Sequence, residues 1–160
     1  QSVNRLVLMA PAGLPVHMGA GVAGLVATPW LGEALFKAIA VRTLLAAAAK
    51  EWVHPSRCRE HTEAIRKIVA QCGSSHAGYA RSLFSTLQHF PMQDIRNALA
   101  VIRANRTPTK LIWGDIDTVC PYRNAAVMKE LIGPTCELET ISPGAHSFVI
   151  EFPERTICAL

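Results

Sequence analysis

The sequence predicts an α/β fold in which a parallel sheet carries a large helical insertion, and three observations lead to this prediction. A short apolar run at residues 3–10 is closed by a Pro-Ala-Gly turn. Residues 16–50 are rich in alanine, leucine and glycine. From residue 109 onward, strand-like and helix-like segments alternate to the end of the chain. Such alternation is typical of parallel strands joined by right-handed crossover helices.

The first element is expected to be a buried strand, because residues 3–10 form a mostly β-favouring apolar run that ends at Pro11-Ala12-Gly13. Helices are expected after it. Pro29 stands where a helix would begin, and apolar side chains follow it at helical spacing. The break at His54-Pro55 predicts the start of a new helix, with Ser56 as its cap.

This new helix is expected to have its apolar face within residues 64–69 and to end at a loop formed by Gly73-Ser74-Ser75. Two further helices are expected over residues 78–89 and 92–104. Pro91 separates them, because proline interrupts helices.

The last third of the chain returns to the α/β pattern. In chain order it predicts a strand at 110–113, a helix at 124–132, a strand at 136–141, and a closing helix at 148–160 with Pro153 in its first turns. Residues 1–13 and 107–160 are therefore interpreted as the core of the fold. Residues 14–106 are interpreted as a helical cap, or lid, with its return helices.

Composition excludes several classes of function. Half of the residues are hydrophobic and 18% are charged, which does not suit a disordered chain. The net charge of +4 comes from scattered cations, so nucleic acid is not an expected partner. The five cysteines form no C-x-x-C pair, which favours reduced thiols and a cytoplasmic location. No cofactor is expected.

A zinc site is an alternative interpretation of one stretch. Its potential ligands are His54, Cys58, His61, Cys72 and His76. Their spacing does not match a compact zinc finger, so they are interpreted as polar positions on a helix and its following loop, and no metal is expected.

A membrane-spanning helix is not expected. The span from Leu6 to Gly32 has no charged residue when histidine is counted as neutral, but its prolines and glycines would interrupt a continuous helix. Peripheral contact of the cap with a membrane surface is an open alternative. The first residues do not have the pattern of a signal peptide.

Two stretches near the C-terminus carry the chemistry. Residues 109–121, T-K-L-I-W-G-D-I-D-T-V-C-P, are a strand followed by a loop that presents Asp117. Residues 141–154, I-S-P-G-A-H-S-F-V-I-E-F-P-E, present His146 ahead of a helix. An Asp followed by a His, each after a strand, forms the second half of a Ser…Asp…His relay. Loops that follow neighbouring parallel strands meet at one sheet edge, so the two side chains are expected there together.

In these motifs the chain resembles the C-terminal part of an α/β-hydrolase-fold protein with a helical cap. Residues 1–13 are similar to the strand after the nucleophile helix, and residues 29–36 to a common cap segment. Residues 108–121 match the acid-loop pattern P-x-x-x-I-W-G-x-x-D-x-x-x-P, which places the acid on Asp117. His146 begins the H-x-x-x-x-E-x-P-E run that follows the histidine of the family.

The resemblance implies a hydrolase with a catalytic triad in which Asp117 and His146 are the acid and the base. The G-x-S-x-G elbow of serine enzymes does not occur in these 160 residues. By the family pattern the elbow is expected about twenty residues before Gln1, with the oxyanion-hole loop further upstream, so the chain alone is expected to be inactive. Ala145 stands where the family commonly has glycine, which is expected to perturb the loop slightly without removing the base.

Other residues are weaker candidates for these roles. Asp115 is interpreted as a solvated loop residue rather than a substitute acid. Four side chains considered as an internal nucleophile are interpreted as loop or packing residues, because closeness in sequence does not create attack geometry. They are Ser74, Ser75, Cys120 and Ser147.

The first functional hypothesis is a serine-type carboxylic ester hydrolase, esterase- or lipase-like, that acts on a small hydrophobic acyl substrate. The apolar cap favours this substrate, although the same side chains would also serve as packing. They are Met18, Val22, Leu25, Val26, Trp30, Leu31, Phe36 and Trp52.

Two alternatives stay open. The nucleophile could be Ser, Asp or Cys, so an epoxide or haloalkane hydrolase with an Asp nucleophile is the alternative among enzymes. The alternative outside enzymes is a non-catalytic interaction module. It would self-associate, or bind an N-terminal chain, through the strand edge at residues 6–9.

Overall fold

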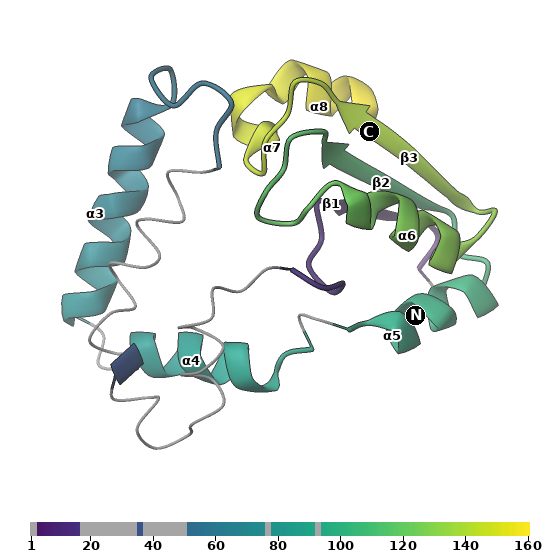
Figure 1. The fold of residues 1–160 in the computed structure, drawn as a ribbon, viewed down its shortest axis with the longest axis horizontal. Helices are drawn as coiled ribbons and strands as arrows, with labels where there is room; N and C mark the ends of the chain where they lie inside the picture. The colour runs from purple at the N-terminus through teal and green to yellow at the C-terminus, as the bar shows by residue number, and fades with distance from the viewer. Residues whose placement is uncertain (1–2, 17–34, 37–50, 76–77, 92–93) are drawn as a thin grey trace. The chain divides into compact units, whose positions relative to one another are not determined.

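Figure 1 shows the fold in the computed structural model, which describes residues 3–16, 35–36, 51–75, 78–91 and 94–160. The chain divides into two compact units. The first comprises residues 1–16, 50–53 and 91–160, and the second comprises residues 17–49 and 54–90. Some predictions lie outside the described residues: the helix beginning at Pro29, the ligand candidate His76, and six apolar residues of the predicted cap, Met18, Val22, Leu25, Val26, Trp30 and Leu31.

A three-stranded parallel sheet forms the centre of the first unit, with strands β1 (Leu6–Met9), β2 (Thr109–Gly114) and β3 (Cys136–Ile141) in that order. This arrangement confirms the predicted α/β fold. The first residues of the three strands lie opposite one another, and β2 and β3 also end opposite one another. The loops that follow β2 and β3 therefore leave the sheet at the same edge.

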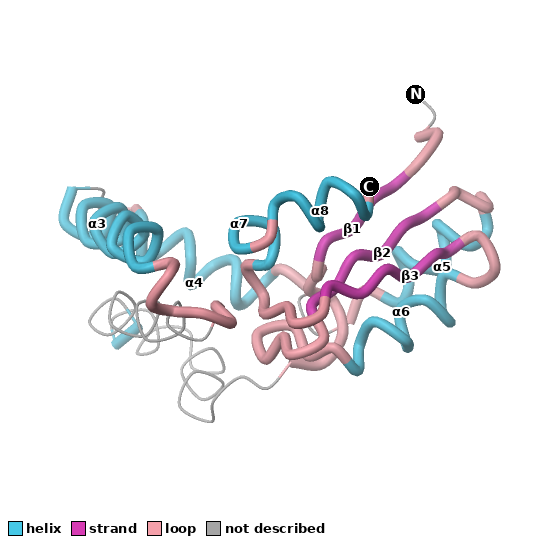
Figure 2. Tube along the Cα trace, turned by 90° about the horizontal axis from the view of Figure 1, so that it is seen from above, coloured by secondary structure: helices cyan, strands magenta, loops and turns pink. Residues whose placement is uncertain are grey.

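Helices cover both faces of this sheet (Figure 2). On one face lie α5 (Arg96–Ala104) and α6 (Arg123–Ile132), and on the other lie α7 (Phe148–Glu151) and α8 (Pro153–Ala159). Strand β2 lies between its two neighbours, and its residues 111–113 are fully buried. A continuous apolar run is typical of a central parallel strand, because such a strand is buried on both faces.

The core on the α6 side follows from helical periodicity. Ala125, Met128 and Ile132 recur at intervals of three and four residues, which places them on one face of the helix, and all three are fully buried. From α5, Leu99 is buried in the same core and Ile102 packs against it. Helix α5 therefore belongs to the first unit, whose last segment begins at residue 91.

The C-terminal segment corrects the prediction of one closing helix over residues 148–160. It forms two short helices, α7 and α8, which are separated at Phe152, where φ is −133° and ψ is 60°. Pro153 causes this break, because its ring disfavours the helical conformation at the preceding residue and it has no N–H to continue the hydrogen-bond ladder.

The second unit contains α3 (Arg59–Ser75) and α4 (Tyr79–His89). The predicted loop at Gly73-Ser74-Ser75 is wrong, because α3 continues through these residues. One glycine costs a helix only about 1 kcal/mol, which its other residues can offset. Ser56 is not the helix cap either, since α3 begins three residues after it.

Candidate active site

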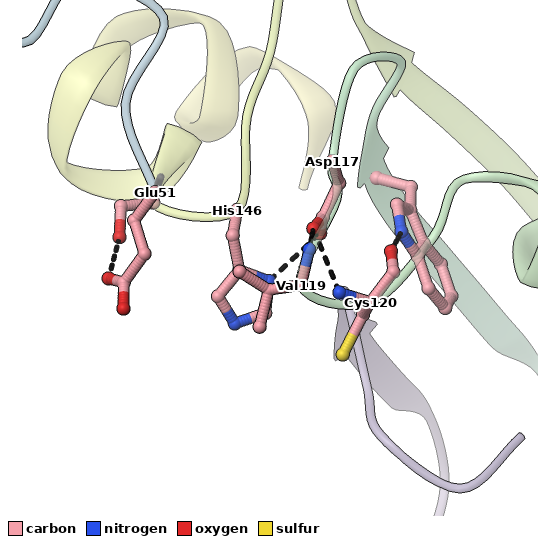
Figure 3. Close-up of polar contacts among 7 residues, drawn as sticks. Glu51, Asp117, Val119, Cys120 and His146 are labelled. Atoms are coloured by element: carbon pink, nitrogen blue, oxygen red, sulfur yellow. Dashed lines mark hydrogen bonds and ion pairs between the residues drawn. The ribbon is translucent and has the colours of Figure 1, made fainter. Parts of the chain in front are cut away.

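The structure brings the two predicted site residues into contact. His146 Nδ1 donates a hydrogen bond to Asp117 Oδ2 over 2.8 Å (Figure 3). Asp117 lies in the loop after β2 and His146 in the loop after β3, and the sequence separates them by 29 residues. The parallel pairing of β2 with β3 brings these loops together, as the alternation of strands and helices in the sequence predicted.

Asp117 is held in one orientation by its own loop. Its Oδ1 accepts hydrogen bonds from the backbone N–H groups of Val119 (2.8 Å) and Cys120 (2.9 Å). The Asp117 side chain is fully buried, so an unsatisfied carboxylate would be costly. Because both oxygens have partners, the carboxylate is kept aimed at the imidazole of His146.

Asp115 has a structural role that the sequence interpretation missed. Rather than facing only solvent, its carboxylate accepts hydrogen bonds from the Ser142 hydroxyl (2.6 Å) and from the Gly144 N–H (2.9 Å). The hydroxyl of Ser142 is the main reason that the pKa of Asp115 lies below its ordinary value. Asp115 thus ties the acid loop to the loop of His146, and it is not the residue in contact with the imidazole.

The two loops also touch directly through their backbones. A Cβ atom added at Gly114 would overlap the carbonyl oxygen of Gly144, and one added at Gly144 would lie 2.9 Å from the Gly114 Cα. Ile116 N–H also donates to the Gly144 carbonyl over 3.0 Å. Glycine at both positions therefore permits the close approach that places Asp117 beside His146.

Ala145, where glycine was the family expectation, is accommodated by the loop. Its side chain is buried at 3% exposure. Among the described residues other than glycine, only Ala10 and Arg106 have a positive φ, so the position occupied by Ala145 does not require glycine.

The imidazole of His146 is partly exposed, and its electrostatic environment favours the protonated form. Its side chain is 29% exposed, and Figure 3 shows its second ring nitrogen, Nε2, on the side away from Asp117. The hydrogen bond with Asp117 raises the pKa of His146 above its ordinary value of 6.5. Burial opposes this rise, while the negative charges of Asp117 and Glu51 add to it.

Two of the considered nucleophiles are occupied or inert. Burial, together with the charge of Asp117, raises the pKa of the Cys120 thiol to about 11, so the thiol is protonated at neutral pH. The Ser147 hydroxyl donates to the Glu51 carboxylate over 2.8 Å and is thereby directed to Glu51. Ser74 and Ser75 belong to the end of α3.

The described residues also bear on metal binding, disulfides, membrane spans and the apolar residues of the predicted cap. Within them, no group of three His, Cys, Asp or Glu side chains is arranged to hold a metal ion, and none of the five cysteines forms a disulfide. None of their helices is long and apolar enough to cross a membrane. Two of the apolar residues assigned to the cap are described: Trp52 is buried in the first unit, and Phe36 packs on Phe84 in the second with ring centroids 5.4 Å apart.

No protein-family model and no curated protein sequence matches the chain. Solved structures do. One is MGS-M2, an alpha/beta hydrolase enzyme from a Medee basin deep-sea metagenome library, with a TM-score of 0.66 and 15% identity over 96% of this chain and 53% of that one. Another is a hydrolase from Pseudomonas aeruginosa PA01, with a TM-score of 0.54 and 22% identity over 98% of this chain and 53% of that one. The chain spans about half the length of these structures.

Proposed function

We propose that this chain, whose fold is that of the α/β hydrolases, supplies the acid and the base of a serine-type carboxylic ester hydrolase. Asp117 is the acid and His146 is the base. The nucleophile is supplied by a segment outside these 160 residues, which contain no G-x-S-x-G elbow. The observation that carries the proposal is the 2.8 Å hydrogen bond between a fully buried carboxylate and a partly exposed imidazole.

The geometry supports a defined division of roles within the imidazole. Nδ1 keeps its proton and donates a hydrogen bond to Asp117, so the lone pair of the neutral ring is on Nε2. A serine hydroxyl placed within hydrogen-bond reach of Nε2 can give up its proton as it attacks the ester carbonyl. His146 then gives this proton to the departing alcohol. In a second cycle, water attacks the acyl-enzyme and the carboxylic acid product is released.

The substrate class rests on the sequence of the cap, whose apolar residues favour a small hydrophobic acyl group. The names of the two similar solved structures identify them as hydrolases but specify no substrate. Cytoplasmic location and peripheral membrane contact stay predictions.

The direct test is hydrolysis of p-nitrophenyl esters of increasing acyl length by the longest native form of the protein. We expect His146→Ala to lower kcat by roughly 10⁴-fold or more, because the serine loses its general base. Labelling by a fluorophosphonate identifies a serine nucleophile. The 160-residue chain alone is expected to show no His146-dependent turnover. Equal turnover by the parent protein and the His146→Ala variant would refute the assignment.

The same experiment distinguishes a serine nucleophile from an Asp nucleophile. An Asp nucleophile predicts no fluorophosphonate label, together with His146-dependent opening of an epoxide or loss of halide from a haloalkane. The ester assay and the label therefore discriminate between these two enzymatic readings.

The pH dependence of turnover is a second prediction. The base must be neutral, so kcat/KM should fall on acidification with a midpoint above 6.5, since Asp117 raises the pKa of His146. Removing the acid with Asp117→Ala should move the midpoint of the remaining activity to lower pH. A profile with the same midpoint in both proteins would mean that Asp117 does not control the base.

A non-catalytic interaction module is the second candidate function. It is favoured by the sheet edge, because among the described residues β1 hydrogen-bonds with β2 alone. An unpaired strand edge promotes association with another strand. Light scattering that gives a dimer mass, with no turnover or label in any form of the protein, would favour this function over hydrolysis.

A further inference from the structure

We propose that Glu51 is a second carboxylate of this site, a positioning residue that holds the loop of His146 through Ser147. The inference rests on the proposed function of His146 as the base. Glu51 lies in the short segment 51–53, which belongs to the same compact unit as the sheet. Figure 3 shows Glu51 and Asp117 on opposite sides of His146.

Two hydrogen bonds join Glu51 to the residue directly after the base. The Ser147 hydroxyl donates to the Glu51 carboxylate over 2.8 Å, and the Ser147 N–H donates to the Glu51 carbonyl over 3.0 Å. Both the side chain and the backbone of Ser147 are thereby fixed. Because His146 is covalently next to Ser147, this pair of bonds limits how far the imidazole can move from Asp117.

A third bond attaches the same segment to the helix that follows. Val53 N–H donates to the Glu151 carboxylate over 2.8 Å, and Glu151 is the last residue of α7. The segment 51–53 thus holds α7 at Ser147, just before the helix begins, and at Glu151, where it ends. Ser147 itself accepts from the N–H groups of Ile150 and Glu151, so the loop of His146 continues into a rigid turn.

The charge of Glu51 gives it an electrostatic effect as well as a mechanical one. Among the described residues, the charged groups that act on the imidazole are Asp117, from the acid loop, and Glu51, from the segment 51–53. Both raise the pKa of His146, while burial lowers it. Cys120, in the acid loop, is neutral at the pH of catalysis and adds no charge. A carboxylate on each side of the ring favours the imidazolium that forms when the base takes the proton.

Glu51→Gln separates these two effects. The glutamine keeps the side-chain oxygen that accepts from Ser147 but removes the negative charge. Selective ¹³C labelling of histidine in the longest native form allows an NMR titration of His146, assigned with His146→Gln. We expect the midpoint to move to lower pH in Glu51→Gln, and the acid limb of kcat/KM to move with it.

The matched control is Glu154→Gln, which removes one exposed carboxylate from the first turn of α8. It is expected to leave the His146 midpoint unchanged. A shift in Glu51→Gln no larger than in this control would overturn the electrostatic part of the inference.

Ser147→Ala tests the mechanical part, because it removes the donor without touching the charge. We expect roughly a 10-fold loss of kcat with little change in KM, as is usual when a partner that orients an active residue is lost. A kcat equal to that of the parent protein would overturn this part. Full turnover by His146→Ala would instead refute the proposed function, and the NMR titration would still report on Glu51 independently.

Discussion

Asp117→Asn is expected to lower kcat by about 10⁴-fold with the fold intact, as the equivalent change does in the serine-protease template. The reason lies in the partners of the two carboxylate oxygens. Oδ1 accepts from two backbone N–H groups, of Val119 and Cys120, so an amide NH₂ cannot occupy that position. The amide oxygen of asparagine must take it, and the NH₂ group then faces His146 Nδ1.

This orientation reverses the tautomer of the imidazole. A donor facing Nδ1 requires Nδ1 to accept, which moves the ring proton to Nε2, and Nε2 then has no lone pair for the nucleophile. The measurement is kcat for an ester substrate, with urea unfolding to verify that the variant is folded. A loss of less than 10-fold would show that Asp117 does not set the tautomer.

Asp115→Asn is the matched control, because it makes the same chemical change two residues earlier. Here the amide oxygen can still accept from the Gly144 N–H, while the NH₂ group donates to the Ser142 hydroxyl, which is able to accept. Both contacts of the native carboxylate are therefore preserved in kind. We expect less than a 10-fold change in kcat, and the contrast between the two variants assigns the acid.

The central part of this site could be predicted because its determinants are local and periodic. A buried apolar run predicts β2, the alternation of elements predicts parallel pairing with β3, and parallel pairing brings both following loops to one edge. The juxtaposition of Asp117 and His146 follows from that topology. Their catalytic roles remain a proposal.

Glu51 could not be predicted in the same way. It lies 96 residues from Ser147 in the sequence, and its segment has no motif that indicates a return to the site. Only the tertiary path of the chain brings the two together. The hydrogen bonds of Asp115 could not be predicted for a related reason, since its partners Ser142 and Gly144 are on another loop.

The predicted helix boundaries were wrong where two local preferences competed. Pro153 was assigned to the first turns of a helix, where proline is tolerated, but it begins α8 instead and ends α7 at the residue before Phe152. In α3, Gly73 suggested a loop, yet a single glycine does not outweigh a continuing helix.

Gly114→Ala is expected to destabilise the protein by about 2 to 3 kcal/mol, because the new methyl group overlaps backbone atoms that cannot rotate away. A Cβ at this position meets the carbonyl oxygen and carbon of Gly144 and the carbonyl oxygen of Ala145. The overlap can be relieved only by separating the acid loop from the loop of His146. Because Ala145 directly precedes the base, this separation should also lengthen the contact between His146 and Asp117.

A displacement of about 1 Å in such a contact costs roughly 10²-fold in rate, so kcat should fall by about that factor. Urea unfolding measures the stability and an ester assay measures kcat. Gly78→Ala is the matched control, since a Cβ there has nothing within 4 Å and Gly78 has an ordinary φ of −85°. Its free energy of unfolding should stay within about 0.5 kcal/mol of the parent. If Gly114→Ala were as stable and as active as Gly78→Ala, close backbone contact between the two loops would not be what aligns the base with its acid.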